Sequence, residues 1–199
     1  MSMQIECMDP YVYPETNILK NLRGIRDREL LSIFEMDMTT RRAGELLVRP
    51  TPGKFDIPHL KSIHAYIFQD VCEWAGEFRT VNIARPGQFY FAYFQQITPA
   101  LSGLLDALRK EQYLMGLGLE PFCKRAGHYM GELNAIHPFR DGNGRNQREF
   151  IRQLGRHNDF ALQWSLVTRD QMGEASKRSF EKGDNAGLAD VIQLSIQTS

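Results

Sequence analysis

The stretch His137-Pro-Phe-Arg-Asp-Gly-Asn-Gly-Arg-Asn-Gln-Arg148 lies between two segments with helical periodicity. Apolar residues recur at 122, 126, 130 and 133 before it, and at 150, 151 and 154 after it. This spacing places apolar side chains on one face of a helix. The sequence therefore predicts a helix, a polar loop over 137–148 and a second helix.

The loop contains the parts of an anion site. Gly142-Asn143-Gly144 can adopt positive φ angles, which would let successive backbone N–H groups point into one concavity. That concavity would lie at the N-terminus of the next helix, where unpaired N–H groups and the helix dipole favour a negative charge. Arg145 and Arg148 are three positions apart and project from nearly one side of the first turn. We expect phosphate groups to bind here.

Two further side chains of the loop suit a phosphate substrate. Asp141 offers one hard oxygen ligand, and Mg²⁺ is commonly held by one or two carboxylates together with substrate phosphates. Histidine is the side chain whose ordinary pKa lies closest to neutral pH, so His137 could take a proton from an attacking hydroxyl. Together these groups are what a phosphoryl-type transfer requires. Each alone has a simpler interpretation: a turn, a helix cap, or a solvated arginine face. Phe139 is expected to be a core residue that anchors the loop under every interpretation.

Composition limits the class of protein. The chain has 199 residues, which favours one domain, and its 24 basic and 24 acidic residues give a net charge of zero. That balance excludes a generally basic nucleic-acid binder. The three cysteines form no CxxC pair, which indicates a reducing compartment rather than disulfides or a zinc cluster. No signal peptide is evident, and polar residues and prolines interrupt the uncharged stretch 86–105. We expect a cytoplasmic protein that binds neither membranes nor nucleic acid directly.

The remaining pattern predicts a mainly α domain over 1–199 with one β-hairpin. Residues 1–16, rich in proline and tyrosine, are expected to form an extended N-terminal arm. The hairpin is expected at about 78–93, with Arg85-Pro86-Gly87-Gln88 as a type II turn. Helices are expected at about 27–47, 56–74, 99–111, 121–135, 144–158, 168–181 and 186–197.

These residues resemble a known family. The loop matches, without departure, the signature HxFx(D/E)GNGRxxR of Fic (filamentation induced by cAMP) proteins, which transfer AMP from ATP to protein hydroxyls. Residues 11–16, 53–56, 74–76 and 132–136 also resemble segments of bacterial Fic domains, particularly the short toxin-like modules. The resemblance implies a nucleotidyltransferase with a Fic-type helical fold. It also implies that the hairpin serves as a flap beside the active-site loop.

The resemblance assigns a role to each residue of the motif. His137 would be the general base that deprotonates a Tyr, Ser or Thr hydroxyl of a target protein. Asp141 would hold Mg²⁺ at the ATP phosphates. The anion nest would come from Gly142, Asn143 and Gly144, while Arg145 would contact the β- and γ-phosphates and Arg148 the γ-phosphate.

The resemblance also implies two protein partners. A target protein would dock on the flap by strand addition, and small Fic toxins of this kind make type II topoisomerases candidate targets. Contacts of Lys54, Phe55 and Ile83 with adenine or with the flap are weaker expectations. Many Fic proteins carry an inhibitory helix with the pattern (S/T)xxxE(G/N), which this chain lacks. We therefore expect a separate small antitoxin that supplies the inhibitory glutamate to Arg148.

Three alternatives stay open at this stage. A related enzyme could use another nucleotide or a phosphocholine carrier as donor, although the intact Asp141 and glycines favour ATP. Doc-type kinases typically have lysine where this chain has Gly144, which argues against phosphorylation. A non-catalytic binding domain that keeps the fold is opposed by the intact His137. An arginine-rich nucleic-acid binder is favoured by a local charge of +3 from five arginines (140, 145, 148, 152 and 156) and two acids (141 and 149), a charge that suits a nucleotide as well.

Overall fold

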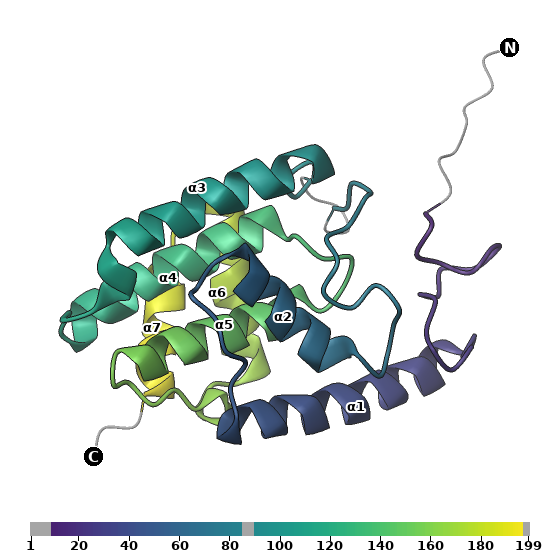
Figure 1. Cartoon of the computed structure of the whole chain (residues 1–199), viewed down its shortest axis with the longest axis horizontal. Helices are drawn as coiled ribbons and strands as arrows, with labels where there is room; N and C mark the ends of the chain where they lie inside the picture. The colour runs from purple at the N-terminus through teal and green to yellow at the C-terminus, as the bar shows by residue number, and fades with distance from the viewer. Residues whose placement is uncertain (1–8, 85–89, 197–199) are drawn as a thin grey trace, which may run out of the picture.

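The computed structural model describes residues 9–84 and 90–196, and most of them are helical (Figure 1). The α-helices are α1 (Arg28–Val48), α2 (Ile57–Phe68), α3 (Ile97–Lys110), α4 (Leu119–Ile136), α5 (Asn143–His157), α6 (Arg169–Lys182) and α7 (Ala186–Ser195). Short 3₁₀ helices lie between some of them: η1 (Phe94–Gln96), η2 (Gln112–Leu114) and η3 (Trp164–Leu166). The expected mainly helical class is confirmed. None of the described helices is long and apolar enough to cross a membrane.

Aspartate side chains cap the N-termini of the first two helices. The side chain of Asp27 accepts a hydrogen bond from the Leu30 N–H at the start of α1. Asp56 does the same for His59 at the start of α2. These side chains satisfy N–H groups that have no partner within the helix. The bounds expected for these starts are therefore close to the observed ones.

The expected helix over 56–74 is too long, because α2 ends at Phe68. Gly76 has a φ of +83°, and a Cβ built on it would lie 2.8 Å from Cβ of Ala65. The chain after α2 therefore turns back and packs directly against the helix. A glycine permits both the positive φ and the close approach.

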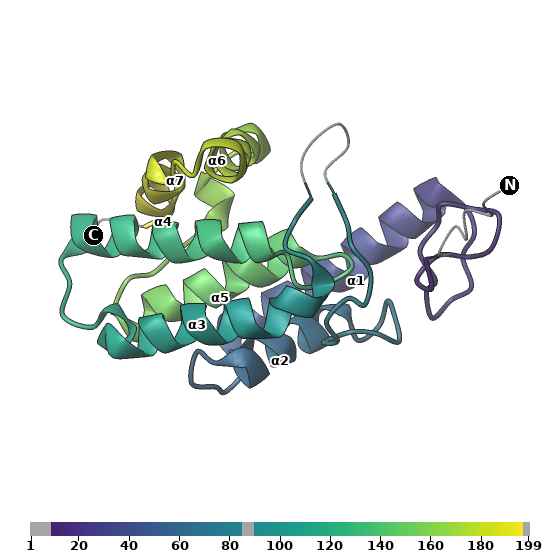
Figure 2. The same ribbon diagram turned by 90° about the horizontal axis from the view of Figure 1, so that it is seen from above.

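The flap expected at 78–93 is not confirmed as a hairpin. Ala84 and Tyr90 form one antiparallel bridge, and the Phe91 N–H donates to the Ile83 carbonyl (3.2 Å). No strand is assigned among the described residues, and the expected turn at 85–89 lies outside them. We call residues 80–84 and 90–93 the two arms of this segment. Figure 2 shows them side by side, projecting from the helical body.

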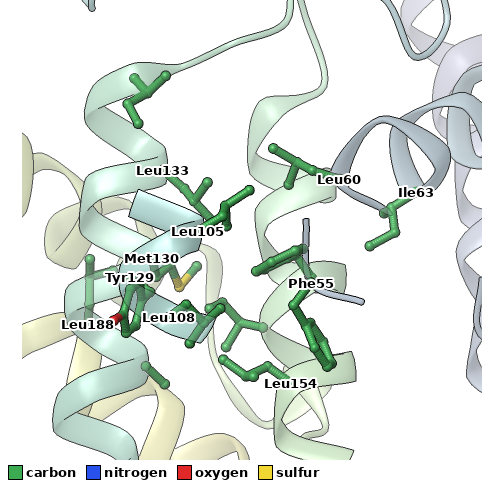
Figure 3. Packing of buried hydrophobic residues seen from close by; sticks show 14 of the residues in the cluster. Phe55, Leu60, Ile63, Leu105, Leu108, Tyr129, Met130, Leu133, Leu154 and Leu188 are labelled. Atoms are coloured by element: carbon green, nitrogen blue, oxygen red, sulfur yellow. The ribbon is translucent and has the colours of Figure 1, made fainter. Parts of the chain in front are cut away.

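Helix α4 lies at the centre of the helical body and packs against α3, α5, α6 and α7. Apolar side chains of α2, α3, α4, α5 and α7 meet around it (Figure 3): Leu60, Ile63, Leu105, Leu108, Tyr129, Met130, Leu133, Leu154 and Leu188. At Gly131 of α4 a Cβ would lie 2.1 Å from Oδ1 of Asn185. The absence of a side chain there lets α7 approach closely. The last turn of α4 is thus fixed from several sides, and the motif loop begins there.

The described part of the N-terminal arm lies against the segment that follows α2. The Tyr11 ring packs edge-on against Trp74 with centroids 5.5 Å apart, and its hydroxyl lies 3.2 Å from the Thr80 hydroxyl. Asp9 pairs with Arg140 of the motif loop at 2.7 Å. Val12 and Leu19 form an antiparallel bridge, so the chain reverses direction between them. Residues 1–8 of the expected arm lie outside the described residues.

Candidate active site

His137 ends α4 in a left-handed conformation, with φ 50° and ψ 62°. This region is unfavourable for a residue other than glycine, so the surrounding contacts must hold it. Its ring lies parallel to the Phe91 ring, with centroids 3.8 Å apart. Its Nδ1 lies 3.2 Å from the Asn134 carbonyl oxygen. Because a carbonyl can only accept, this contact places a proton on Nδ1, so Nε2 is the ring nitrogen that would act as the base.

Phe139 and Asn143 fix the loop after His137. Phe139 is fully buried, as expected for an anchor. The Asn143 side chain accepts from the Phe139 N–H (2.9 Å) and donates to the Phe139 carbonyl (2.8 Å). Asn143 therefore closes the loop through its side chain, and only its backbone N–H can face a ligand.

His64 of α2, a residue outside the motif, hydrogen-bonds to the backbone of the motif loop. The Gly76 N–H donates to its Nδ1 (2.8 Å), so its Nε2–H donates to the Asp141 carbonyl (3.0 Å). The imidazole is fully buried between Phe68 and Phe139, with ring centroids 4.6 and 3.9 Å away. Its only signal in the sequence is a histidine on the apolar face of the helix, a pattern typical of an ordinary core residue.

Lowering the pH is expected to destabilise the protein through His64. Burial lowers the pKa of His64 to about 4, against 6.5 ordinarily. Between these values the unfolded chain binds the proton and the folded protein does not. The contribution of neutral His64 is complete above pH 6.5 and is lost as the pH falls towards 4, by up to about 3 kcal/mol. Urea unfolding at pH 7 and 4.5 would measure it. Wild type should lose more stability than His64→Gln, and equal losses would contradict the expectation.

Gly142 precedes α5 with a φ of +76°. A Cβ built on it would lie 2.1 Å from Cζ of Phe68, so the loop passes too close to α2 for any side chain. Gly144 does not share this conformation: it lies in the first turn of α5 and has no positive φ. The expected pair of left-handed glycines is therefore reduced to one, because the helix has already begun at Asn143.

Replacing Gly142 with alanine is expected to destabilise the protein by about 3 kcal/mol, through overlap with Phe68 and the left-handed backbone. Gly173 of α6 is the matched control, because nothing would lie within 4 Å of a Cβ at this position and its φ is not positive. Gly173→Ala should stabilise by up to about 1 kcal/mol, as in any helix interior. Thermal unfolding of both variants would decide. A Gly142→Ala variant as stable as wild type would contradict this account of the loop.

The first turn of α5 offers backbone donors. The first helical hydrogen bond is donated by Asn146 to the Gly142 carbonyl. The N–H groups of Asn143, Gly144 and Arg145 come before it, and no side chain in the described part of the chain caps this end of the helix. Together with the dipole of α5, they form a site suited to an anion.

The two motif arginines differ in their surroundings. Arg145 is held by α1: its guanidinium pairs with Glu35, donates to the Thr39 hydroxyl (3.1 Å) and lies over the Phe68 ring at 4.5 Å. Burial and the nearby Asp141 carboxylate raise the pKa of Glu35. Sequence reasoning missed Glu35 and Thr39, whose only signal is a spacing of four within the first expected helix.

Arg148 has no carboxylate partner and donates no side-chain hydrogen bond within residues 9–84 and 90–196. Burial, followed by the neighbouring Arg145, lowers the pKa of its guanidinium. Its Nη1 lies 3.3 Å from the position of a Cβ on Gly144, so the side chain folds over the start of α5. Arg145 and Arg148 line one cavity of about 650 Å³ between α1 and α5. The cavity therefore contains a desolvated positive charge that lacks an anion.

Asp141 lies beside the start of α5, and its side chain is 40% exposed. An Arg145 nitrogen lies 3.7 Å from its carboxylate. No cluster of three or more metal-ligating side chains exists among the described residues. A single accessible carboxylate next to a helix end suited to an anion fits Mg²⁺, which commonly takes its other ligands from water and substrate phosphates.

The remaining candidate residues fall in two places. Phe55 is buried against Phe150 and His157 in the second half of α5, away from the motif loop, and Lys54 lines a separate cavity of about 370 Å³. The structure does not bring this pair to the loop, because the turn before α2 packs on the far end of α5. Ile83, in contrast, lies in the first arm, hydrogen-bonded through its carbonyl to Phe91, which stacks on His137.

Comparisons with known proteins agree with this geometry. Residues 54–154 match the profile of the Fic/DOC family. The chain is 45% identical over 172 residues to the protein adenylyltransferase VbhT of Bartonella schoenbuchensis, a match that covers 86% of this chain and 36% of VbhT. The chain thus spans about a third of the length of that relative. It is 36% identical to a probable protein adenylyltransferase Fic of Salmonella typhimurium, covering 96% of this chain and 94% of that protein.

Solved structures share the fold. The Bartonella tribocorum protein BepC, with bound AMPPNP, superposes with a TM-score of 0.90 at 28% identity, covering 95% of this chain and 97% of that one. The N-terminal Fic domain of a Bartonella quintana protein, with bound ADP, also gives 0.90, at 30% identity and 95% coverage of both chains.

Proposed function

The chain belongs to the Fic/DOC family, and from this premise we propose that it is a protein adenylyltransferase that moves AMP from ATP to a hydroxyl group of a target protein. The observation that carries the proposal is the combination at the motif loop. A histidine whose Nδ1 faces the Asn134 carbonyl lies near an uncapped helix start and near Arg148, which has no carboxylate partner in the described residues. The names of the relatives and the nucleotides bound to the structural neighbours support the same chemistry.

In the proposed reaction, His137 Nε2 accepts the proton of a Tyr, Ser or Thr hydroxyl. The hydroxyl oxygen forms a bond to the α-phosphorus of ATP, the bond to the bridging oxygen of the β-phosphate breaks, and pyrophosphate leaves. The N–H groups at the start of α5 bind phosphate oxygens, and Arg148 pairs with the γ-phosphate. Arg145, already held by Glu35, adds positive charge at the β- and γ-phosphates. Mg²⁺ bound at Asp141 would neutralise phosphate charge.

Radiolabelled ATP tests this function. Purified protein, Mg²⁺ and a bacterial lysate should yield labelled protein bands when the label is on the α-phosphorus and none when it is on the γ-phosphorus. A label that transfers from the γ-phosphorus would show phosphorylation instead. The absence of any labelled band in either reaction would contradict the proposal.

The target protein is proposed to dock on the two arms of the 80–93 segment. Tyr90 and Tyr93 are exposed, 62% and 58%, and their rings stack with centroids 6.3 Å apart. Backbone groups of the arms would pair with an extended target segment, as in strand addition. Phe91 lies between these tyrosines in sequence and stacks on His137, so a target bound there would lie close to the base. Type II topoisomerases are the first class of target to test.

A small antitoxin is proposed as the second partner, supplying a glutamate to Arg148. The internal carboxylate of Glu35 pairs with Arg145 and leaves Arg148 without one in the described residues. Leu30, Ile33 and Met36 of α1 are exposed, and Met36 lines this cavity; these side chains would pack against a helix of the partner. Purified chain without any partner should then be active. An intact chain that labels no target on its own would count against a separate inhibitor.

A further inference from the structure

Arg79 is a buried arginine for which the motif gives no role. Its side chain is among the largest fully buried ones, with a relative exposure of 2%. No carboxylate pairs with it anywhere in the described chain. An isolated buried charge is costly unless hydrogen bonds satisfy it. The hydrogen-bond partners of the guanidinium therefore indicate its role.

The Arg79 guanidinium donates to four backbone carbonyls. Nε binds the His137 carbonyl (2.9 Å), and Nη2 binds that of Ile136 (3.2 Å), the last residue of α4. Nη1 binds the Val81 carbonyl (2.7 Å) in the first arm, and Nη2 also binds the Ala92 carbonyl in the second. The charge is thus compensated by the negative end of the α4 dipole and by both arms.

These bonds join the two parts that a transfer reaction must align. The backbone N–H of Arg79 donates to the Pro138 carbonyl (3.0 Å), so three consecutive carbonyls around His137 are bound by one residue. His137 has an unfavourable backbone conformation, which these bonds stabilise. Ala92 directly follows Phe91, whose ring stacks on the His137 imidazole. A shift of Arg79 would therefore move the imidazole relative to the arms.

We propose that Arg79 is a positioning residue that sets the placement of the His137 imidazole relative to the two arms, where the target hydroxyl is presented. This inference rests on the proposed transfer to a target docked at the arms. Arg79 touches neither ATP nor the target, and it acts through the backbone of His137, Val81 and Ala92. Lysine cannot replace it, because one ammonium group cannot span carbonyls from three segments.

The test compares Arg79→Lys with Arg125→Lys. Arg125 is on α4, and its guanidinium binds Glu111 and Tyr129 away from the loop. The Arg125→Lys variant therefore controls for the loss of one arginine's hydrogen bonds elsewhere in the fold. The rate of AMP incorporation into lysate protein is measured as a function of ATP concentration. Arg79→Lys should lower the maximal rate roughly 100-fold, as a misplacement of about 1 Å can, and leave the KM for ATP within about twofold. Arg125→Lys should change neither by more than about twofold.

A second readout does not depend on activity. Long-range ¹H–¹⁵N spectra of the nucleotide-free protein report the His137 tautomer, which should be Nδ1-protonated in wild type and mixed in Arg79→Lys. A variant with the wild-type rate and tautomer would overturn the proposal, as would a maximal rate and an ATP affinity that fall together. If Arg79→Lys does not fold, Arg79→Gln replaces it in both measurements. If neither variant folds, Arg79 contributes to stability alone, and the proposal is overturned too. A wild-type protein that transfers no AMP would refute the proposed function, and the tautomer comparison would still decide the role of Arg79.

Discussion

Replacing His137 with alanine is expected to lower AMP transfer by about 100- to 10,000-fold, the usual contribution of a general base. ATP binding should be unchanged, because the imidazole acts on the attacking hydroxyl and not on the nucleotide. The structure is consistent with this division, since the His137 ring packs on Phe91 of the second arm while the N–H groups proposed to bind phosphate belong to α5. Initial rates of transfer and the Kd for AMPPNP would be measured together.

His128→Ala is the matched control for this variant, because His128 lies on the same helix and packs beside Tyr129, away from the loop. It should transfer AMP at the wild-type rate. Transfer by His137→Ala within tenfold of wild type would show that another group takes the proton. Loss of AMPPNP binding in the same variant would show that the imidazole contributes to the nucleotide site.

Replacing Arg148 with alanine is expected to weaken kcat/KM for ATP by roughly 10- to 100-fold, the value of a lost hydrogen-bonded ion pair of about 1.5–3 kcal/mol. The Arg148 guanidinium is buried and pairs with no carboxylate among the described residues. A γ-phosphate bound there would therefore form an ion pair with it without displacing another anion. The loss should be smaller than that of His137→Ala and should affect ATP binding much more than AMP binding.

Arg156→Ala provides the comparison for Arg148, because Arg156 lies in the last turn of the same helix, away from the uncapped N-terminus. It should bind ATP as wild type does. Equal losses of ATP and AMP affinity in Arg148→Ala would place the guanidinium elsewhere than at the terminal phosphate.

The motif and the helical class could be predicted because their causes are local. Apolar spacing located α4 and α5, and the predicted helix starts at 27 and 56 coincide with the aspartates whose side chains cap α1 and α2. The chemistry of the loop followed from residue types at fixed separations on one helix end. Gly144 was the exception, because the sequence shows that a glycine can adopt a positive φ but not where the helix begins.

The supporting residues could not be predicted, because distant parts of the chain place them. Glu35 and Arg145 are 110 residues apart, and His64 and Asp141 are 77 apart. Arg79 and His137 are 58 apart. In the sequence these side chains look like ordinary positions on a helix or in a turn. Packing also decides the place of Phe55, which lies against Phe150 and His157 of α5, away from the motif loop; its contact with adenine or the flap stays a prediction.

The mass of a modified target tests the central claim most directly. A band labelled by the purified protein in a lysate would be isolated, digested and analysed by tandem mass spectrometry. The account predicts one Tyr, Ser or Thr residue whose mass increases by one AMP group, and no such peptide in the His137→Ala reaction. A peptide that carries a single phosphate group, or an AMP-modified peptide produced equally well by His137→Ala, would contradict it.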